Sequence, residues 1–443
     1  MWIKPIIFSF FLFFNGLFMT LFAQDTLSME ESIQMALENN YGLQIERSRM
    51  QVAETEKAAG RAAFMPALRL DGGADRRIED TDLDFVDGGG LEREGALTES
   101  FNGAAIVEYR FFDGFRMFAD YNQLKALEDV SIREYELGLQ STVSEVMNTY
   151  LELLKAIQNK ATAEKTVALS RKRLNFEQNR FELGAGAKTE LLAAKVDFNS
   201  DTSDYIKQQE SIDELKIMLN QLMGRSVMTP FEVQPETPID LDEEVDYESL
   251  KTAMTDNHPE LSRQQRLFES AMLERQAVRS GFYPTLDFNF GTRYNQLESE
   301  AGFVARNQTQ GVNYGLNVQW NLFNGFMVRR QQQIADLNIE IAGLQIQEAT
   351  LGLEADLATA YRIYENNLIL LRLEEENLST AAENQDIAFE NYELGNISYL
   401  ALREAQNNYV QAENRFYEIR YTVKENYVRL MELSGVLLKS HSN

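Results

Sequence analysis

The stretch GAGAKT, residues 184–189, places a lysine and a threonine behind two glycines, and glycine-rich loops of this kind can bind phosphate. A complete phosphate-binding loop has the pattern G-x-x-x-x-G-K-[ST], in which backbone N–H groups surround the phosphates and the lysine neutralises them. Here Ala187 occupies the position of the second glycine, directly before Lys188. The pattern is incomplete, so a nucleotide site would need support from elsewhere in the chain.

Other residues that could do chemistry are few. The 443 residues include no cysteine and two histidines, His258 and His441, which excludes thiolate nucleophiles, disulfides and zinc fingers. Paired acids occur, but a chain with 69 Asp and Glu contains such pairs by chance. The net charge of −27 argues against a nucleic-acid partner, because phosphates require Lys/Arg surfaces. We therefore predict no enzyme, no cofactor and no metal site, and we interpret His258 as a helix-start residue.

The N-terminal residues 1–23 are typical of a secretory signal peptide. Lys4 precedes an apolar run that ends at Phe22, and Ala23 is a small residue at the predicted cleavage point. No basic cluster follows the run, which favours a cleaved leader over the alternative, an uncleaved membrane anchor. The mature protein is therefore predicted to work outside the cytoplasm.

The glycine stretch occurs twice in the chain. RFELGAGAKTELLAAKVDFN (180–199) aligns without gaps to NYELGNISYLALREAQNNYV (391–410). Both contain Glu-Leu-Gly between helical patterns, whereas the second copy has no Lys-Thr pair. Glycine at a helix end adopts the left-handed conformation at little cost. We therefore predict that GAGAKT is a turn between two helices, with Gly184 and Gly395 at the two helix-turn tips.

Further matches extend the duplication over the whole mature chain. EYRFFDGF (108–115) pairs with QWNLFNGF (319–326), and AAFMPALRL (62–70) pairs with SGFYPTLDF (280–288). The predicted units are a first repeat (24–224), a linker (225–246), a second repeat (247–437) and a tail (438–443). Two long copies suggest internal pseudo-symmetry rather than a solenoid of many short repeats.

Each repeat contains two segments in which apolar and polar residues alternate, as in a strand with one apolar face. The predicted strands span about 64–75, 101–112, 282–293 and 312–323. Their length is close to the ~9–11 residues that a tilted strand needs to cross a membrane. The polar segments between them, 75–100 and 294–310, are predicted to be loops. A soluble sheet packed on a core is the alternative.

The polar face of these strands would line a wet, weakly charged barrel wall, formed in the second repeat by Asn289, Asn313, Asn317, Gln319 and Asn321. Four strands cannot close a membrane barrel, because small barrels need about eight. An open strand edge is not tolerated in lipid. If the strands cross a membrane, several chains must therefore share one barrel.

Long helices are predicted after each strand pair. The stretches from Gly114 to Gly184 and from Gly325 to Gly395 contain no proline. A four-three spacing of apolar residues runs through the second stretch, at Leu357, Tyr361, Tyr364, Leu368 and Leu371. This spacing is typical of a coiled-coil seam. We predict helical hairpins over 113–224 and 324–437, each about 100 Å long at ~1.5 Å per residue.

The order of these features resembles the TolC-type outer-membrane efflux family, the outer membrane factors. The likeness covers essentially the whole mature chain. The residues that carry it are the paired stretches 62–70 and 280–288, the strand exits FDGF (112–115) and FNGF (323–326), and the two [FY]-E-L-G turns.

The resemblance implies a membrane β-barrel joined to a long α-helical coiled-coil barrel. Each protomer of a homotrimer would give four strands to one shared twelve-stranded barrel in outer-membrane lipid of a Gram-negative bacterium, with a large periplasmic part. The implied function is the channel of a tripartite efflux system, with a periplasmic adaptor protein and an inner-membrane RND or ABC-type pump as partners. An exit duct for type I protein secretion and a periplasmic coiled-coil scaffold without a channel remain alternatives.

The resemblance also implies a periplasmic gate at the helical tips. Acids just after the second-copy turn ring the narrowest aperture in the family, and the matching positions here are Ala401 and Glu404. Only Glu404 keeps the acid, and three copies of one carboxylate at a constriction would attract cations.

Closed-state links between the two turns complete the gate in the family. The matching residues are Thr189 and Glu190 in the first copy and Tyr392 in the second. A hydrogen bond from the Tyr392 hydroxyl to the Glu190 carboxylate is chemically reasonable. The family's basic partner falls on Ile397, so that half of the link is absent.

Overall fold

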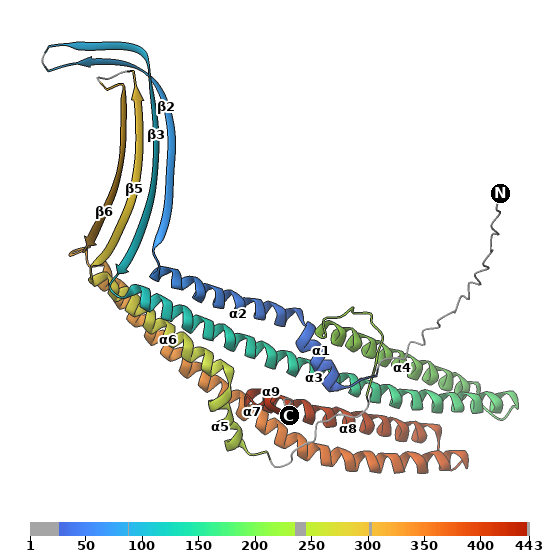
Figure 1. Cartoon of the computed structure of the whole chain (residues 1–443). Helices are drawn as coiled ribbons and strands as arrows, with labels where there is room; N and C mark the ends of the chain where they lie inside the picture. Colours follow the sequence, from blue (N-terminus) through green and yellow to red (C-terminus); the bar gives the residue numbers. More distant parts are fainter. Residues whose placement is uncertain (1–25, 87, 235–244, 301–303, 441–443) are drawn as a thin grey trace, which may run out of the picture.

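The structure of the chain, a computed structural model, describes residues 26–86, 88–234, 245–300 and 304–440. The predicted signal peptide lies outside the described residues, as do residues 235–244 of the predicted linker. The molecule is elongated, with a four-stranded sheet at one end and a long helical part that continues away from it at an angle (Figure 1).

The sheet combines one strand pair from each repeat. Its order is β2-β3-β5-β6, and all neighbouring strands are antiparallel. The strands are β2 (Ala67–Asp84), β3 (Gly90–Phe112), β5 (Thr285–Ser299) and β6 (Arg306–Gln319). The two repeats meet where β3 pairs with β5, and β2 and β6 form the open edges.

The strands are longer at one end than the sequence predicts. Most of 75–100 and 294–310, predicted as loops, belongs to strands whose ladders continue almost to the hairpin turns. Both faces of these extensions are polar, with pairs such as Arg76–Glu99 at 3.3 Å across β2 and β3. The pattern with one apolar face stops there. The strands continue because their ladder is made of backbone N–H and C=O groups, which pair whatever the side chains are.

At the opposite end the strands begin later and stop earlier than predicted. Pro66 and Pro284 stand directly before β2 and β5, because proline has no N–H to donate to a ladder. Residues 320–323 lie beyond β6. There the Trp320 Nε1 donates to the Phe282 carbonyl at 3.1 Å instead of joining a strand.

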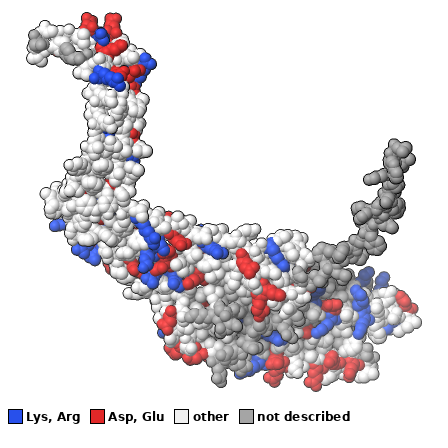
Figure 2. All heavy atoms as spheres, in the orientation of Figure 1, with Lys and Arg blue, Asp and Glu red and all other residues white. Residues whose placement is uncertain are grey.

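One face of the sheet is apolar across all four strands. The register aligns Leu68, Val107, Phe290 and Tyr314 in one row. Tyr314 is 79% exposed in the single chain. Figure 2 shows a band with few charged residues over the sheet, between the charged hairpin ends and the charged helices. Exposed apolar faces of this extent mark contact with a membrane or a partner.

The strand-to-helix joints repeat the same conformation in both halves. Gly114 and Phe115 have φ of 72° and 70°, and Gly325 and Phe326 both have φ near 65°. A phenylalanine in the left-handed region costs on the order of 1 kcal/mol. Each ring packs on the phenylalanine that precedes the turn, with centroids 5.2 Å apart for Phe112 and Phe115. The joint therefore sets the angle between strand and helix twice in one chain.

Two helices of 67 residues each form the length of the molecule, and two of 35 residues each return from their tips. The long helices are α3 (Arg116–Glu182) and α7 (Met327–Glu393), and the returning ones are α4 (Lys188–Leu222) and α8 (Tyr399–Leu433). The shorter elements are β1 (Thr26–Leu27), α1 (Met29–Asn39), α2 (Tyr41–Gly60), η1 (Arg61–Phe64), β4 (Glu232–Val233), α5 (Tyr247–Asn257), α6 (Pro259–Arg279), η2 (Ser280–Phe282) and α9 (Leu437–Ser440).

The helices form a curved layer that continues the order of the strands. Near the sheet the neighbours are α2, α3, α6 and α7, and toward the tips they are α4, α3, α8 and α7 (Figure 1). Within the described parts of the chain, no helix has both the length and the apolar character needed to cross a membrane. His258 is the N-cap of α6, where its Nδ1 accepts from the Glu260 N–H at 3.2 Å, as predicted.

Two buried clusters hold the helical part together. In the first, the Tyr150 hydroxyl lies 2.9 Å from the Leu27 carbonyl and 3.1 Å from that of Gln234, which ties the β1–β4 pair to α3. The second contains the seam predicted in α7, with Leu357 and Tyr364 fully buried against α5 and α8.

Glu425 on α8 gives the helical part a pH-dependent stability. Its Oε1 is buried with no hydrogen-bond partner among the described residues. The pKa of Glu425 is raised to about 7, chiefly by burial; Lys155 lowers it in part, and Glu152 and Glu418 raise it. The folded state therefore holds more protons than the unfolded state between about pH 4.5 and 7, and the protein loses stability as pH rises through that window.

We expect Glu425→Gln to be more stable than the wild type at pH 8, by on the order of 1–2 kcal/mol, because the carboxylate keeps part of its contact with water. The difference should vanish near pH 4, where both side chains are neutral. Thermal unfolding at pH 4 to 8 measures it, with the exposed Glu376→Gln as control. A gain that is equal at all pH values would contradict the assignment.

Candidate functional site

The two helical tips end in glycine turns. Gly184 has φ +75° and Gly395 has φ +76°. Backbone N–H groups of Ala185 and Asn396 return to the carbonyls of Arg180 and Asn391 at 2.8 and 2.9 Å, which satisfies the last carbonyls of α3 and α7. The stretch GAGAKT is thus a helix-to-helix turn, and the backbone N–H groups of its first four residues, 184–187, donate to acceptors within the chain.

The predicted gate residues lie at the exposed end of these turns. Thr189 and Glu190 are in the first turn of α4, and Glu404 is in the second turn of α8. All three are exposed, and Glu404 forms no ion pair with any described residue. Glu190 accepts from the Ala187 N–H at 3.4 Å, so its carboxylate caps its own helix.

Tyr392 makes a hydrogen bond across the hairpins, but to a different acid from the one predicted. Its hydroxyl donates to Glu177 Oε1 at 2.6 Å, and not to Glu190. The side chain of Glu177 is 2% exposed and faces α7 from α3. Glu190 is held by its helix terminus and lies 3.7 Å from Arg180, which also contacts Glu177 at 3.4 Å.

Burial, followed by the hydrogen bond to the Glu177 carboxylate, raises the pKa of Tyr392 to about 12. The hydroxyl therefore stays protonated and remains a donor at any physiological pH. A hydrogen bond to a charged acceptor is roughly twice as strong as a neutral one. The link between α3 and α7 at the tip thus keeps its hydroxyl donor throughout the physiological pH range.

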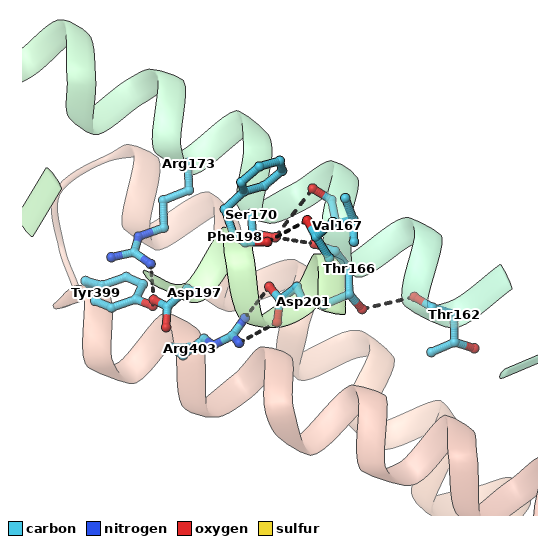
Figure 3. Close-up of polar contacts among 11 residues, drawn as sticks. Thr162, Thr166, Val167, Ser170, Arg173, Asp197, Phe198, Asp201, Tyr399 and Arg403 are labelled. Carbon is cyan, nitrogen blue, oxygen red and sulfur yellow. Dashed lines mark hydrogen bonds and ion pairs between the residues drawn. The ribbon is translucent and has the colours of Figure 1, made fainter. Parts of the chain in front are cut away.

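A second set of links joins the hairpins through α8 (Figure 3). Arg173 on α3 binds Asp197 on α4 at 2.6 Å, and the Tyr399 hydroxyl donates to the same carboxylate. The Arg173 guanidinium lies over the Tyr399 ring. One helical turn away, Arg403 contacts both carboxylate oxygens of Asp201, at 2.8 and 3.1 Å.

Each of these links, and the Tyr392–Glu177 contact, has one buried partner. Arg173, Asp201 and Glu177 are each less than one-tenth exposed. Burial and the Asp197 carboxylate raise the pKa of Tyr399, so it too stays a donor. Removing one partner of a buried ion pair costs about 3–5 kcal/mol, because the other charge is left without compensation. The tip is therefore held by contacts that are strong only while the two hairpins keep their relative position.

The α8 links were missed by the sequence analysis. The signal that could have found them is a pair of complementary spacings: Asp197 and Asp201 are four residues apart on α4, and Tyr399 and Arg403 are four apart on α8. Residues with this spacing share one helix face. The hydroxyls of Thr166 and Ser170, also drawn in Figure 3, donate to carbonyls of their own helix and take no part in the links.

Comparisons with known proteins agree on one family. Residues 32–225 and 252–436 match the outer membrane efflux protein family. Protein CyaE of Bordetella pertussis is 23% identical over 339 residues, which covers 76% of this chain and 69% of that protein. The proteases secretion protein PrtF of Dickeya chrysanthemi is 22% identical over 431 residues, covering 93% of this chain and 88% of that protein.

Among solved structures, the CmeC outer membrane channel of Campylobacter jejuni superposes with a TM-score of 0.78 at 17% identity. The match covers 94% of this chain and 89% of that one. At this identity the likeness shows a shared fold.

We expect Arg403→Gln to lower the free energy of unfolding by about 3–5 kcal/mol, because it leaves the buried Asp201 unpaired. Arg362→Gln is the control, since its pair with Glu365 is exposed and such pairs contribute about 0–1 kcal/mol. Chemical unfolding of the purified protein measures both. The double variant Arg403→Met with Asp201→Leu should recover most of the lost free energy of unfolding. Equal losses of stability in Arg403→Gln and in the control Arg362→Gln would contradict this account.

Proposed function

This chain belongs to the family of outer membrane efflux proteins, and from that premise we propose that three copies of it form the channel of a tripartite efflux system. Proteins of this family work with a periplasmic adaptor and an inner-membrane pump. The channel would pass substrates from an RND or ABC-type pump to the exterior. Its sheet would stand in the outer membrane and its helices would reach through the periplasm.

The open edges of the sheet support the trimer. The four strands leave the ladders of β2 and β6 unpaired on one side each, and the apolar face is exposed. In lipid every backbone polar group needs a partner, so only a closed barrel is stable there. Three copies supply twelve strands, which exceeds the minimum of about eight.

The helical layer has the same open edges, at α2 and α7. On α7 an apolar stripe with three-four spacing is 51–69% exposed: Ile334, Leu337, Ile341, Leu344 and Leu351. On α2, Tyr41, Ile45 and Val52 are 53–70% exposed. Such a stripe is expected to pack on a partner helix. We propose that the α7 stripe of one copy packs against α2 of the next, closing a helical barrel below the strand barrel.

The polar face of the sheet would line the lumen. Asn289 and Asn317 lie on it as predicted, together with charged residues. Arg110 binds Asp287 at 2.7 Å on the neighbouring strand, and Arg69 lies 3.6 Å from Glu108. The charges are paired, so the wall carries little net charge at this level. Such a wall favours a wide conduit with low selectivity.

The links at the tip would act as the gate. Opening requires the α7–α8 hairpin to move relative to α3 and α4, and this breaks the Tyr392–Glu177 and Arg403–Asp201 contacts. Thr189, Glu190 and Glu404 are exposed at the same end, where three copies of Glu404 would ring the aperture. Because these links form within each chain, an adaptor must supply the free energy that separates the hairpins.

A second candidate is an exit duct for type I protein secretion, favoured by the similarity to PrtF, a proteases secretion protein. The two functions differ in the pump. Cross-linking in living cells followed by mass spectrometry identifies it: an ABC-type pump with a polypeptide cargo supports secretion, and a proton-driven pump supports efflux.

In planar bilayers we expect a small, cation-selective conductance from the purified protein. Glu404→Ala should reduce the cation-over-anion permeability ratio by about twofold or more, because a carboxylate ring sets that preference. Tyr392→Phe should raise the conductance by removing a closed-state bond. Glu54→Ala removes an exposed carboxylate far from the tip and serves as control.

Two other outcomes are informative. Conduction that neither tip variant changes would reject the gate residues and keep the channel. A water-soluble protein that never conducts would reject the channel and favour the scaffold.

Ile341→Glu should prevent assembly, because it places an unpaired charge within each helical contact, at a cost of several kcal/mol per site. Light scattering of the detergent-solubilised protein should give a trimer for the wild type and a monomer for the variant. Gln331→Glu adds the same charge on α7 outside the stripe and should remain trimeric. A trimeric Ile341→Glu protein would place the contact elsewhere.

A further inference from the structure

A cavity of about 320 Å³ lies between the two hairpins near the tip. Its walls come from α3, α7 and α8. The apolar part of the wall includes Phe176, Phe389 and Leu402, and the polar part includes Lys172 and Arg173. Ligand pockets in proteins are typically about 300–1,000 Å³, mostly apolar, with a few placed polar groups. The cavity therefore has the size and composition of a small ligand site.

Arg173 is 8% exposed and has donors that no described residue uses. Its Nη1 binds Asp197, but Nε and Nη2 are buried without a hydrogen-bond partner. The Tyr399 ring contacts the face of the guanidinium and does not accept from its edge. Buried polar groups are nearly always paired, so two unused donors on one side chain require an explanation.

The two unused donors form a matched set. Nε–H and Nη2–H point in the same direction along one edge of the planar guanidinium, which is the geometry that accepts both oxygens of a carboxylate. Lys172 adds a second positive charge to the wall, and no Asp or Glu lines the cavity. The nearest carboxylates are already engaged, Asp197 by Arg173 and Glu177 by Tyr392. The electrostatics of the site therefore favour an anion.

We propose that this cavity binds a small amphipathic anion, an aromatic carboxylate or sulfonate. The acid group accepts from Nε and Nη2 of Arg173, with Lys172 nearby, and the aromatic body lies among Phe176, Phe389 and Leu402. Because the walls belong to both hairpins, the ligand joins α3 to α7 and α8. The site is a property of the single chain and does not depend on the proposed channel.

Titration calorimetry with 2-naphthoate tests the site on the full mature protein in detergent. We expect saturable binding with one site per chain, and binding of the neutral 2-naphthamide at least tenfold weaker. Leu169→Trp fills the cavity from its wall and should abolish the saturable heat. Lys195→Gln removes an exposed charge on α4 outside the wall and should bind like the wild type. All variants are measured in the same detergent, so the heat from 2-naphthoate that partitions into micelles is the same for each and cancels in the comparison.

Arg173→Gln should weaken 2-naphthoate by more than tenfold and leave 2-naphthamide unchanged. If that variant does not fold, because it also loses the Asp197 pair, Lys172→Gln provides the charge test, with an expected loss of about threefold. Equal affinity for the acid and the amide would overturn the anion site. Unchanged binding in Leu169→Trp would place the ligand outside this cavity and overturn the proposal as well.

Discussion

The unpaired edges of a four-stranded sheet are the constraint on which the rest of this molecule depends. Among the described residues, the ladders of β2 and β6 are satisfied on one side only, and no element covers the sheet's apolar face. A single chain therefore cannot be stable in lipid. The helical layer also has two edges without a partner, because α2 and α7 each carry an exposed apolar stripe. Closing one barrel would close the other, because the repeated joints at Phe115 and Phe326 give both halves the same strand-to-helix angle.

At the far end the constraint is reversed, because contacts within the chain join the two hairpins. Tyr392 reaches Glu177, and Arg403 reaches Asp201, each across the two hairpins. These contacts are buried, so their strength depends on exclusion of water as much as on charge. A movement that admits water weakens each of them at once. In the proposed channel this makes the tip a two-state element. The hairpins are held rigidly together while water is excluded from the links, and they can move once they separate.

The sequence predicted the features that depend on local conformation or one-sided burial. The glycine turns followed from Glu-Leu-Gly, and the seam on α7 followed from spacing alone. The strand extensions over 75–100 were missed because both of their faces are polar, so the backbone ladder leaves no hydropathy signal. The partner predicted for Tyr392 was wrong because Glu190 was taken from the family resemblance, which aligns the turns but does not show which acid on the first hairpin faces α7. Only the rotation of α3 shows that Glu177 is buried against α7.

The two repeats share a scaffold but differ in the chemistry of their tips. The first carries acids on its returning helix, Asp197 and Asp201, and the second carries Tyr399 and Arg403. A duplicated unit with identical tips would place like groups against each other, and like charges repel. Divergence into complementary sets allows the hairpins of one chain to bind each other without changing the turn that ends each long helix. The same divergence leaves Arg173 with unused donors, because the second copy offers it an aromatic ring and the first copy offers one carboxylate. The links between the hairpins and the cavity thus both arise from one asymmetry between two otherwise equivalent hairpins.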